Sequence, residues 1–172
     1  MTTDATPDRA SAEPASDKPD LGPAVPFPPP LLFVGGFALG VVASRVWPLA
    51  FPWSNGRASL IGGLMLVAIG VALAITGVIT FRRARVAVYP NRPARNLVTH
   101  GIYRYTRNPM YVGMTAAYLG GVVLTGVAWA LVMLPLVLIV LYAAVIQREE
   151  RHLCERFPDE YLAYSAQVRR WL

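Results

Sequence analysis

Long apolar stretches separated by polar segments run through this chain, and their lengths predict membrane-spanning helices. Residues 31–47 are rich in Gly, Ala and Val, with Arg45 near the end, where its side chain can reach the membrane interface. Residues 58–81 are 24 residues without a charge. A helix of that length measures about 36 Å, which is enough to cross a hydrocarbon core of about 30 Å. Both stretches are therefore predicted to cross a membrane. The second is also predicted to let neighbouring helices approach closely at its glycines, which are Gly62, Gly63, Gly70 and Gly77.

A third apolar stretch is too long for one crossing. Residues 109–147 are 39 residues without a formal charge. As one helix they would extend about 58 Å, roughly twice the thickness of a bilayer core. The best candidate for a break is Thr125-Gly126. The stretch is therefore predicted to be a helical hairpin that returns to the side of the membrane where it started.

The two ends of the chain are more polar. Residues 1–30 hold eight of the 15 prolines together with many Ala, Asp and Ser, and they are predicted to be disordered. Residues 148–172 are charged and amphipathic, and a helix interrupted near Pro158 fits their pattern. The apolar positions of this tail recur every three to four residues: Leu153, Phe157, Tyr161, Tyr164 and Val168.

These patterns predict an all-α, polytopic membrane helical bundle of about four transmembrane helices, with a C-terminal helical hairpin and a cytoplasmic tail helix. Three regions follow: a Pro/Ala-rich tail (1–30), two transmembrane helices (31–81) and a core (82–172). The composition agrees, because 55% hydrophobic and 15% charged residues in a chain of 172 are too apolar for a soluble domain. The mean hydropathy is +0.43.

The distribution of charge predicts the orientation. All ten acids lie in residues 1–20 or from Glu149 onward, whereas residues 21–148 hold ten arginines and no acid. Seven of these arginines fall within residues 82–107, so this Arg-rich loop is predicted to be cytoplasmic, with both termini on the same side. Fifteen arginines against one lysine indicate a GC-rich bacterial genome, so the membrane is predicted to be a bacterial cytoplasmic membrane. Membrane lipids, not nucleic acid, are the expected partners, and the oligomeric state is not predicted.

Metal binding is not expected. The chain has one cysteine, Cys154, and two histidines, His100 and His152, which lie in separate polar segments. A metal site would need more ligands at recognisable spacing.

Polar and aromatic residues are concentrated at both borders of the predicted hairpin. Residues 101–113 are rich in Arg, Tyr and Gly. At the other border, charged residues resume in the segment Gln147-Arg148-Glu149-Glu150. Because a hairpin returns its end to the side where it began, these borders are expected to meet. The result would be a pocket with Arg and Tyr on one wall and an acidic pair on the other.

The residue types in this pocket suit a ligand that carries several polar groups. Adjacent carboxylates can bind an ammonium or a ribose diol, and Arg107 can hold a carboxylate with two hydrogen bonds. Tyrosines can stack on a purine or face a sulfonium. S-adenosyl-L-methionine carries all of these groups. NADPH or a lipid headgroup would use some of them.

Residues 103–113 (Tyr-Arg-Tyr-Thr-Arg-Asn-Pro-Met-Tyr-Val-Gly) resemble the Arg-His-Pro-x-Tyr-x-Gly signature of the isoprenylcysteine carboxyl methyltransferase family, which is related to membrane phospholipid N-methyltransferases. Residues 97–101 fit its lead-in. Glu149-Glu150 and the apolar positions after them are similar to its ending, so the resemblance covers about residues 80–172. One departure is Asn108, where the family most often has His. Asn donates and accepts hydrogen bonds but does not titrate.

The resemblance implies an S-adenosyl-L-methionine-dependent methyltransferase that acts on a lipophilic acceptor at the cytoplasmic membrane face. Arg104 and Arg107 are the candidate catalytic residues, with Arg104 orienting an anionic acceptor. The residues implied to form the cofactor site are Gly101, Tyr103, Arg107, Asn108, Pro109, Tyr111, Gly113, Glu149 and Glu150. Carboxyl O-methylation is favoured over lipid amine N-methylation, because an amine must first lose a proton and no dedicated base is evident. Two alternatives stay open: a non-catalytic membrane scaffold, and an NADPH-dependent membrane reductase with a similar core.

Overall fold

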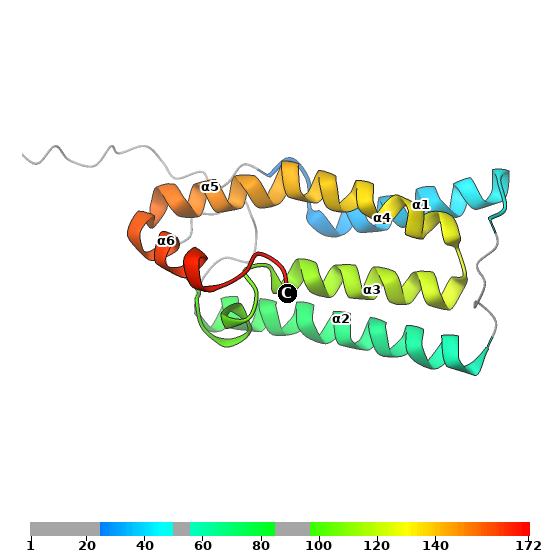
Figure 1. The fold of residues 1–172 in the computed structure, drawn as a ribbon, viewed down its shortest axis with the longest axis horizontal. Coiled ribbons are helices and arrows are strands. Elements are labelled where there is room, and N and C mark those ends of the chain that lie inside the picture. The colour runs from blue at the N-terminus through cyan, green and yellow to red at the C-terminus, as the bar shows by residue number, and fades with distance from the viewer. Residues whose placement is uncertain (1–24, 50–55, 85–96) are drawn as a thin grey trace, which may run out of the picture.

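The computed structural model describes residues 25–49, 56–84 and 97–172, and every regular element in these ranges is helical (Figure 1). This confirms the predicted all-α class. The elements in chain order are α1 (Pro29–Val46), α2 (Arg57–Arg83), the 3₁₀ turn η1 (Gly101–Arg104), α3 (Pro109–Thr125), α4 (Ala128–Leu141), the π-helical segment η2 (Tyr142–Ile146), α5 (Gln147–Arg156) and α6 (Pro158–Gln167).

Three helices of the described residues are long and apolar enough to cross a membrane. They are α1, α2 and the continuous helix Ala128–Arg156, which comprises α4, η2 and α5. The apolar part of this last helix ends at Ile146, and α5 beyond it is charged. Helix α3 is apolar but has only 17 residues. A membrane crossing by α3, which would bring the number of spans to the predicted four, therefore stays a prediction.

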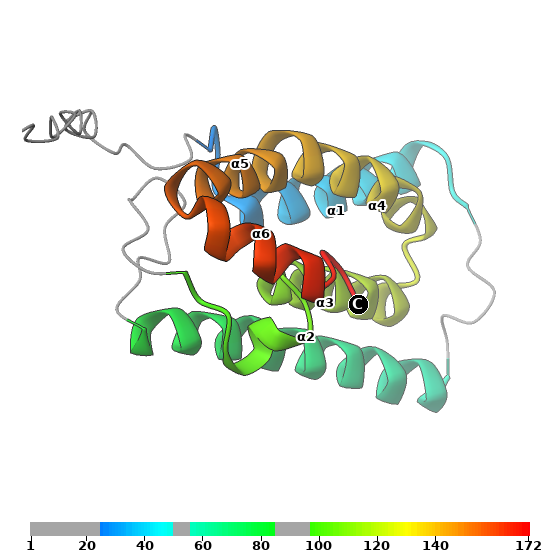
Figure 2. The same cartoon turned by 60° about the vertical axis from the view of Figure 1, so that its left-hand side comes forward.

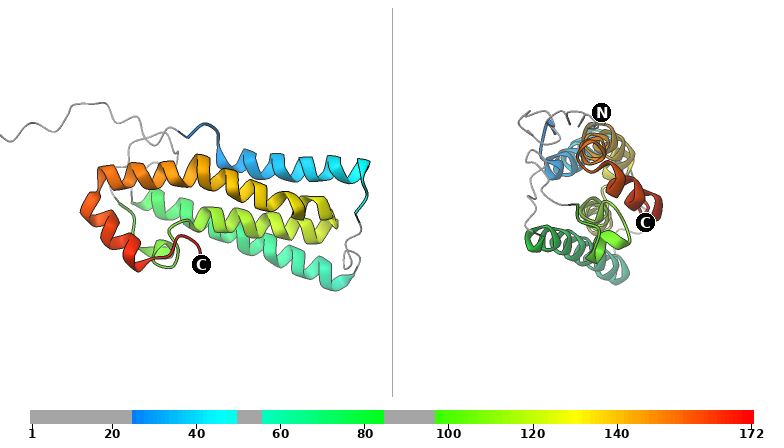
Figure 3. Two further views of the ribbon diagram at one scale, coloured as in Figure 1. Left: turned by 45° about the horizontal axis from the view of Figure 1, so that its top comes forward. Right: turned by 90° about the vertical axis from the view of Figure 1, so that its left-hand side faces the viewer.

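The predicted hairpin break lies where expected, although its two arms pack mainly on other helices. Gly126 ends α3 with a φ of 67°, and its N–H donates to the Val122 carbonyl at 2.8 Å. Before this short turn α3 lies along α2, and after it α4 lies along α1 (Figures 1 and 3). The bundle thus consists of two helix pairs, and the hairpin connects one pair to the other.

Glycines bring α2 and α3 into close contact. Gly63, Gly70 and Gly77 are the buried residues of α2, and each faces α3. A Cβ added to Gly113 of α3 would lie 2.5 Å from the Gly70 carbonyl oxygen, so neither position has room for a side chain. This confirms the predicted close approach at those three glycines of α2. Gly62, for which close approach was also predicted, has open space beside it.

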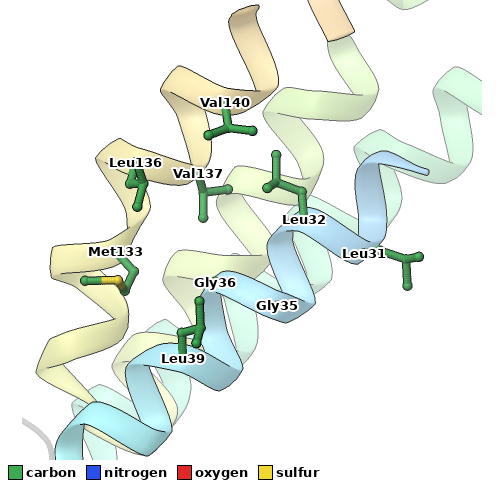
Figure 4. A pocket seen from close by; sticks show the side chains of 9 residues that line it. All are labelled: Leu31, Leu32, Gly35, Gly36, Leu39, Met133, Leu136, Val137 and Val140. Carbon is green, nitrogen blue, oxygen red and sulfur yellow. The ribbon is translucent and has the colours of Figure 1, made fainter. Parts of the chain in front are cut away.

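The outer face between α1 and α4 carries an apolar groove of about 230 Å³ (Figure 4). Gly35 and Leu39 of α1 and Val137 and Val140 of α4 are among its lining residues. All of its lining residues are apolar, so the groove offers no polar side chain to orient a ligand.

Polar elements gather at the other end of the bundle from the Gly126 turn. Helix α5 continues α4 to this end, and α6 folds back from it towards η1 and the start of α3 (Figure 2). The break at Pro158 is confirmed, because α6 begins at that residue. Of the predicted disordered tail, residues 1–24 lie outside the described residues, whereas Val25 is buried and α1 already begins at Pro29. The predicted Arg-rich loop is described only in part, since residues 85–96 also lie outside these ranges.

Candidate functional site

One wall of the candidate site is formed by η1. It begins at Gly101, whose φ of 63° favours glycine. Tyr103 is buried and stacks on Phe81 of α2, with ring centroids 4.9 Å apart and an angle of 10° between the rings. The Tyr164 hydroxyl of α6 donates to the Tyr103 carbonyl at 2.7 Å. These contacts fix η1 against α2 and α6.

The same wall continues into the first turn of α3. Pro109 is fully buried at the start of this helix, which suits its fixed φ and missing N–H. Asn108 precedes it, and its carbonyl accepts from the Tyr111 N–H at 3.1 Å and the Val112 N–H at 3.0 Å. The Asn108 side-chain amide donates to the Arg170 carbonyl at 3.1 Å. Asn108 therefore acts as a hydrogen-bond donor to the chain's C-terminal segment.

The second wall is α5, and Tyr111 connects the first wall to it. The Tyr111 hydroxyl donates to Oε1 of Glu149 at 2.8 Å. Glu149 lies beyond Ile146, where the continuous apolar part of its helix ends. Burial raises the pKa of Glu149 to about 7; the hydrogen bond from Tyr111 acts in the opposite direction, and nearby Glu150 adds to the increase. Glu149 is thus a carboxyl group that changes charge near neutral pH.

Arg107 and Glu150 form a second contact between the walls. Nη1 of Arg107 lies 3.3 Å from Oε1 of Glu150 and donates to the Tyr161 hydroxyl at 3.2 Å. The side chains of Arg107 and Glu150 are only 15% and 18% exposed, so this ion pair is shielded from water. The two polar borders of the hairpin meet, as the sequence predicted.

Arg170 completes this cluster, although the sequence did not predict a role for it in the site. Its Nε and Nη2 donate to the two oxygens of Glu150 at 2.9 and 2.8 Å. Its guanidinium carbon also lies 5.1 Å from the centre of the Tyr142 ring. Arg170 lies beyond Val168, the last residue of the amphipathic pattern in the tail, and it belongs to no recognisable motif. Only its charge, on a chain end expected to lie near the Arg-rich loop, could have drawn attention to it.

Two buried polar atoms of the site have no hydrogen-bond partner within the described residues. They are the hydroxyl of Tyr103 and Nε of Arg107. Burial raises the pKa of Tyr103, so its hydroxyl keeps its proton. Buried donors without a partner are costly, and a bound ligand with acceptor oxygens would satisfy both.

The remaining predicted site residues lie around this cluster or apart from it. Arg104 is exposed at the end of η1. Gly113 faces α2, so helix packing accounts for it. Gly101 borders Thr80 of α2, and its backbone conformation accounts for it. The described residues contain no group of three or more His, Cys, Asp or Glu side chains that could hold a metal ion.

The helices that form the two walls of the candidate site lie within a match to a known protein family. A family described as phospholipid methyltransferase matches residues 58–160, which is more than half of the 172-residue chain. The match extends from α2 into α6 and includes Arg107, Tyr111, Glu149 and Glu150; Arg170 lies beyond it. No curated protein and no solved structure matches the chain significantly.

Proposed function

The chain belongs to the phospholipid methyltransferase family, and from this membership and the contacts above we propose that it transfers a methyl group from S-adenosyl-L-methionine to a lipophilic acceptor at the membrane border. The observation that carries the proposal is the meeting of two distant polar segments. Tyr111 binds Glu149, and Arg107 binds Glu150, at the end of an otherwise apolar bundle. Polar side chains converging beside a membrane span are costly unless they serve a ligand.

The chemistry of these side chains fits S-adenosyl-L-methionine. Within the described residues, the Tyr103 hydroxyl and Arg107 Nε are buried donors without a hydrogen-bond partner, and they suit the cofactor's carboxylate or ribose oxygens. The Glu149 carboxylate suits an ammonium group or a ribose diol. Tyr111 orients that carboxylate, while Asn108 and Pro109 fix the start of α3. Gly113 packs against α2 and Gly101 permits the turn at the start of η1, so both contribute to the shape of the site.

The cofactor, when bound, supplies an electrophilic methyl group on a sulfonium. The chain's own residues would mainly align this group with the acceptor, because methyl transfer needs orientation more than proton transfer. The negative charge of ionised Glu149 favours a cationic ligand in a site shielded from water. Exposed Arg104, on the surface of η1, is placed to orient an anionic acceptor.

Two acceptor classes are proposed, and a different observation supports each. The excess of arginine favours a carboxylate acceptor, which needs no base. The second candidate is a lipid amine, which the description of the matching family as phospholipid methyltransferase supports. An amine acceptor would have to reach the site in its neutral form, because an ammonium must lose a proton before it is methylated.

We place the reaction on the cytoplasmic face of a bacterial membrane. The support for this placement is the set of seven arginines in residues 82–107. The four of them that the structure describes, Arg82, Arg83, Arg104 and Arg107, lie at the same end of the bundle as the candidate site. Reagents that label cysteine from one side of the membrane would test it at Cys154, which lies on α5.

Two measurements test the proposed function. Calorimetry with the purified protein and S-adenosylhomocysteine should show binding. Absence of binding at millimolar ligand would contradict the proposal and leave the scaffold, while binding of NADPH instead would support the reductase. Mass spectrometry of lipids from cells with and without the gene, grown on methyl-labelled methionine, would then identify the acceptor as a methyl ester or a methylated amine.

A further inference from the structure

Arg170 is bonded to both walls of the candidate site. Its backbone carbonyl accepts from Asn108 Nδ2 at 3.1 Å and from the Thr106 hydroxyl at 3.2 Å. Its guanidinium donates to both oxygens of Glu150 on the opposite wall. These partners stand 62, 64 and 20 residues away in the chain. We call residues 168–172, which follow α6, the C-terminal strap.

Further contacts hold the strap in place. The Arg107 N–H donates to the Arg169 carbonyl at 2.9 Å. Trp171 packs against the hydrophobic core, and the guanidinium of Arg170 lies over the Tyr142 ring. The strap is therefore fixed at the start of α3, at α5 and at the π-helical segment between α4 and α5.

This arrangement gives the two adjacent acids different surroundings. Both oxygens of Glu150 bind Arg170, and one of them also faces Arg107. Glu149 receives a bond from Tyr111 at Oε1, which leaves Oε2 to accept from a ligand. A carboxylate held by two guanidiniums is a poor partner for another cation, because its charge is already compensated.

We propose that Arg170 is a positioning residue of the cofactor site, which fixes Glu150 and, through it, Arg107, so that Glu149 is the carboxylate that contacts the cofactor. Glu150 then acts as the link between two arginines. With Nη1 of Arg107 held by Glu150 and Tyr161, its Nε keeps a fixed direction and stays available to an anionic group of the ligand. This inference rests on the proposed function, and it replaces a cofactor contact at Glu150 with an indirect role.

The test is a double-mutant cycle on the full-length protein in lipid nanodiscs, with S-adenosylhomocysteine affinity as the readout. We expect Arg170→Ala to weaken binding about tenfold, since charge-assisted bidentate bonds are among the stronger polar contacts. Arg170→Lys keeps the charge but not the fork, so it should restore part of the affinity. Arg151→Ala removes an exposed arginine next to Glu150 in sequence and serves as the control, with unchanged affinity expected.

Non-additivity identifies the indirect role. If Arg170 acts through Glu150, the Glu150→Gln and Arg170→Ala pair should bind no more weakly than Glu150→Gln alone. Additive losses, or wild-type affinity in both Arg170 variants, would overturn the inference. If the alanine variant does not fold, the lysine variant carries the same comparison. A wild-type protein that binds no S-adenosylhomocysteine would instead contradict the proposed function, and the inference would fall with it.

Discussion

The Tyr111 hydroxyl donates to Oε1 of Glu149 at 2.8 Å, which joins α3 to α5 across 38 positions of the chain. The contact links the first turn of α3 to α5, the helix that follows the hairpin. It also occupies one carboxylate oxygen while holding the group in a fixed orientation.

Removing the Tyr111 hydroxyl should weaken cofactor binding. Tyr111→Phe keeps the buried ring but takes from Glu149 the hydrogen bond that the Tyr111 hydroxyl donates to Oε1. We expect about a fivefold loss of S-adenosylhomocysteine affinity, which corresponds to about 1 kcal/mol. Calorimetry would measure it. Tyr105→Phe is the matched control, because Tyr105 is 73% exposed. An equal loss in both variants would show that the Tyr111–Glu149 bond has no special role.

Cofactor binding should strengthen as the pH rises from 6 to 8. The pKa of Glu149 is raised from 4.5 to about 7, so the carboxyl is mostly protonated at the lower pH and mostly ionised at the higher one. Only the ionised form offers a full negative charge to the ligand, and we expect affinity for S-adenosylhomocysteine to increase by up to about tenfold over this range. Glu149→Gln should bind weakly and show a flat profile.

The stability of the ligand-free protein should respond to pH in the opposite direction. A raised pKa means that the folded state binds the proton more tightly than the unfolded state. The contribution of Glu149 is therefore fully present below pH 4.5 and is lost as the pH rises through about 7. Thermal unfolding of wild type and Glu149→Gln, compared at pH 5 and pH 8, would measure it. A smaller pH response in the wild type than in the variant would contradict the assignment.

Asn108 should be replaceable by a histidine but not by an alanine. Its side chain donates to the Arg170 carbonyl at 3.1 Å, and a histidine ring N–H can donate in the same way. We expect Asn108→His to keep affinity for S-adenosylhomocysteine within about twofold, and Asn108→Ala to lose about fivefold. If the histidine variant loses as much as the alanine variant, the position requires the amide itself.

A methyl group between α2 and α3 should destabilise the bundle. A Cβ on Gly113 would meet the Gly70 carbonyl oxygen at 2.5 Å and the Ala74 nitrogen at 2.9 Å, so the helices must separate. We expect Gly113→Ala to cost about 1–3 kcal/mol, measured as a lower melting temperature in detergent. Gly62→Ala is the control, because nothing lies within 4 Å of the added atom. Its melting temperature should be unchanged or slightly higher.

The hydrophobic pattern was sufficient to predict the long apolar helices and the breaks at Gly126 and Pro158, but it predicted neither η1 nor the π-helical segment η2. An uncharged run of 39 residues must fold back inside a membrane, and Gly126 is the residue best able to end α3 there. Proline at 158 likewise determines the start of α6. Because a hairpin returns to its starting side, the approach of Arg107 and Tyr111 to the acidic pair also followed from the sequence.

The packing partners and the strap did not follow from it. Glycines at positions 63, 70 and 77 indicate a close helix neighbour, but they do not say which one. The matching seven-residue spacing of Gly113 and Gly120 on α3 was a readable sign that these helices pair. Arg170 could not be predicted, because its position depends on the path of residues 168–172, which have no periodic pattern.

The π-helical segment η2 has a consequence for how the acidic pair is aimed. A π-helical turn contains one residue more than an α-helical turn. If residues 142–146 were α-helical at their present number, Glu149 and Glu150 would turn by roughly one residue step, about 100°, away from Tyr111 and Arg107. A chain shortened by one residue there could form an unbroken α-helix and keep both carboxylates in place. The direction of the acidic pair is thus encoded in a residue count, independent of side-chain identity.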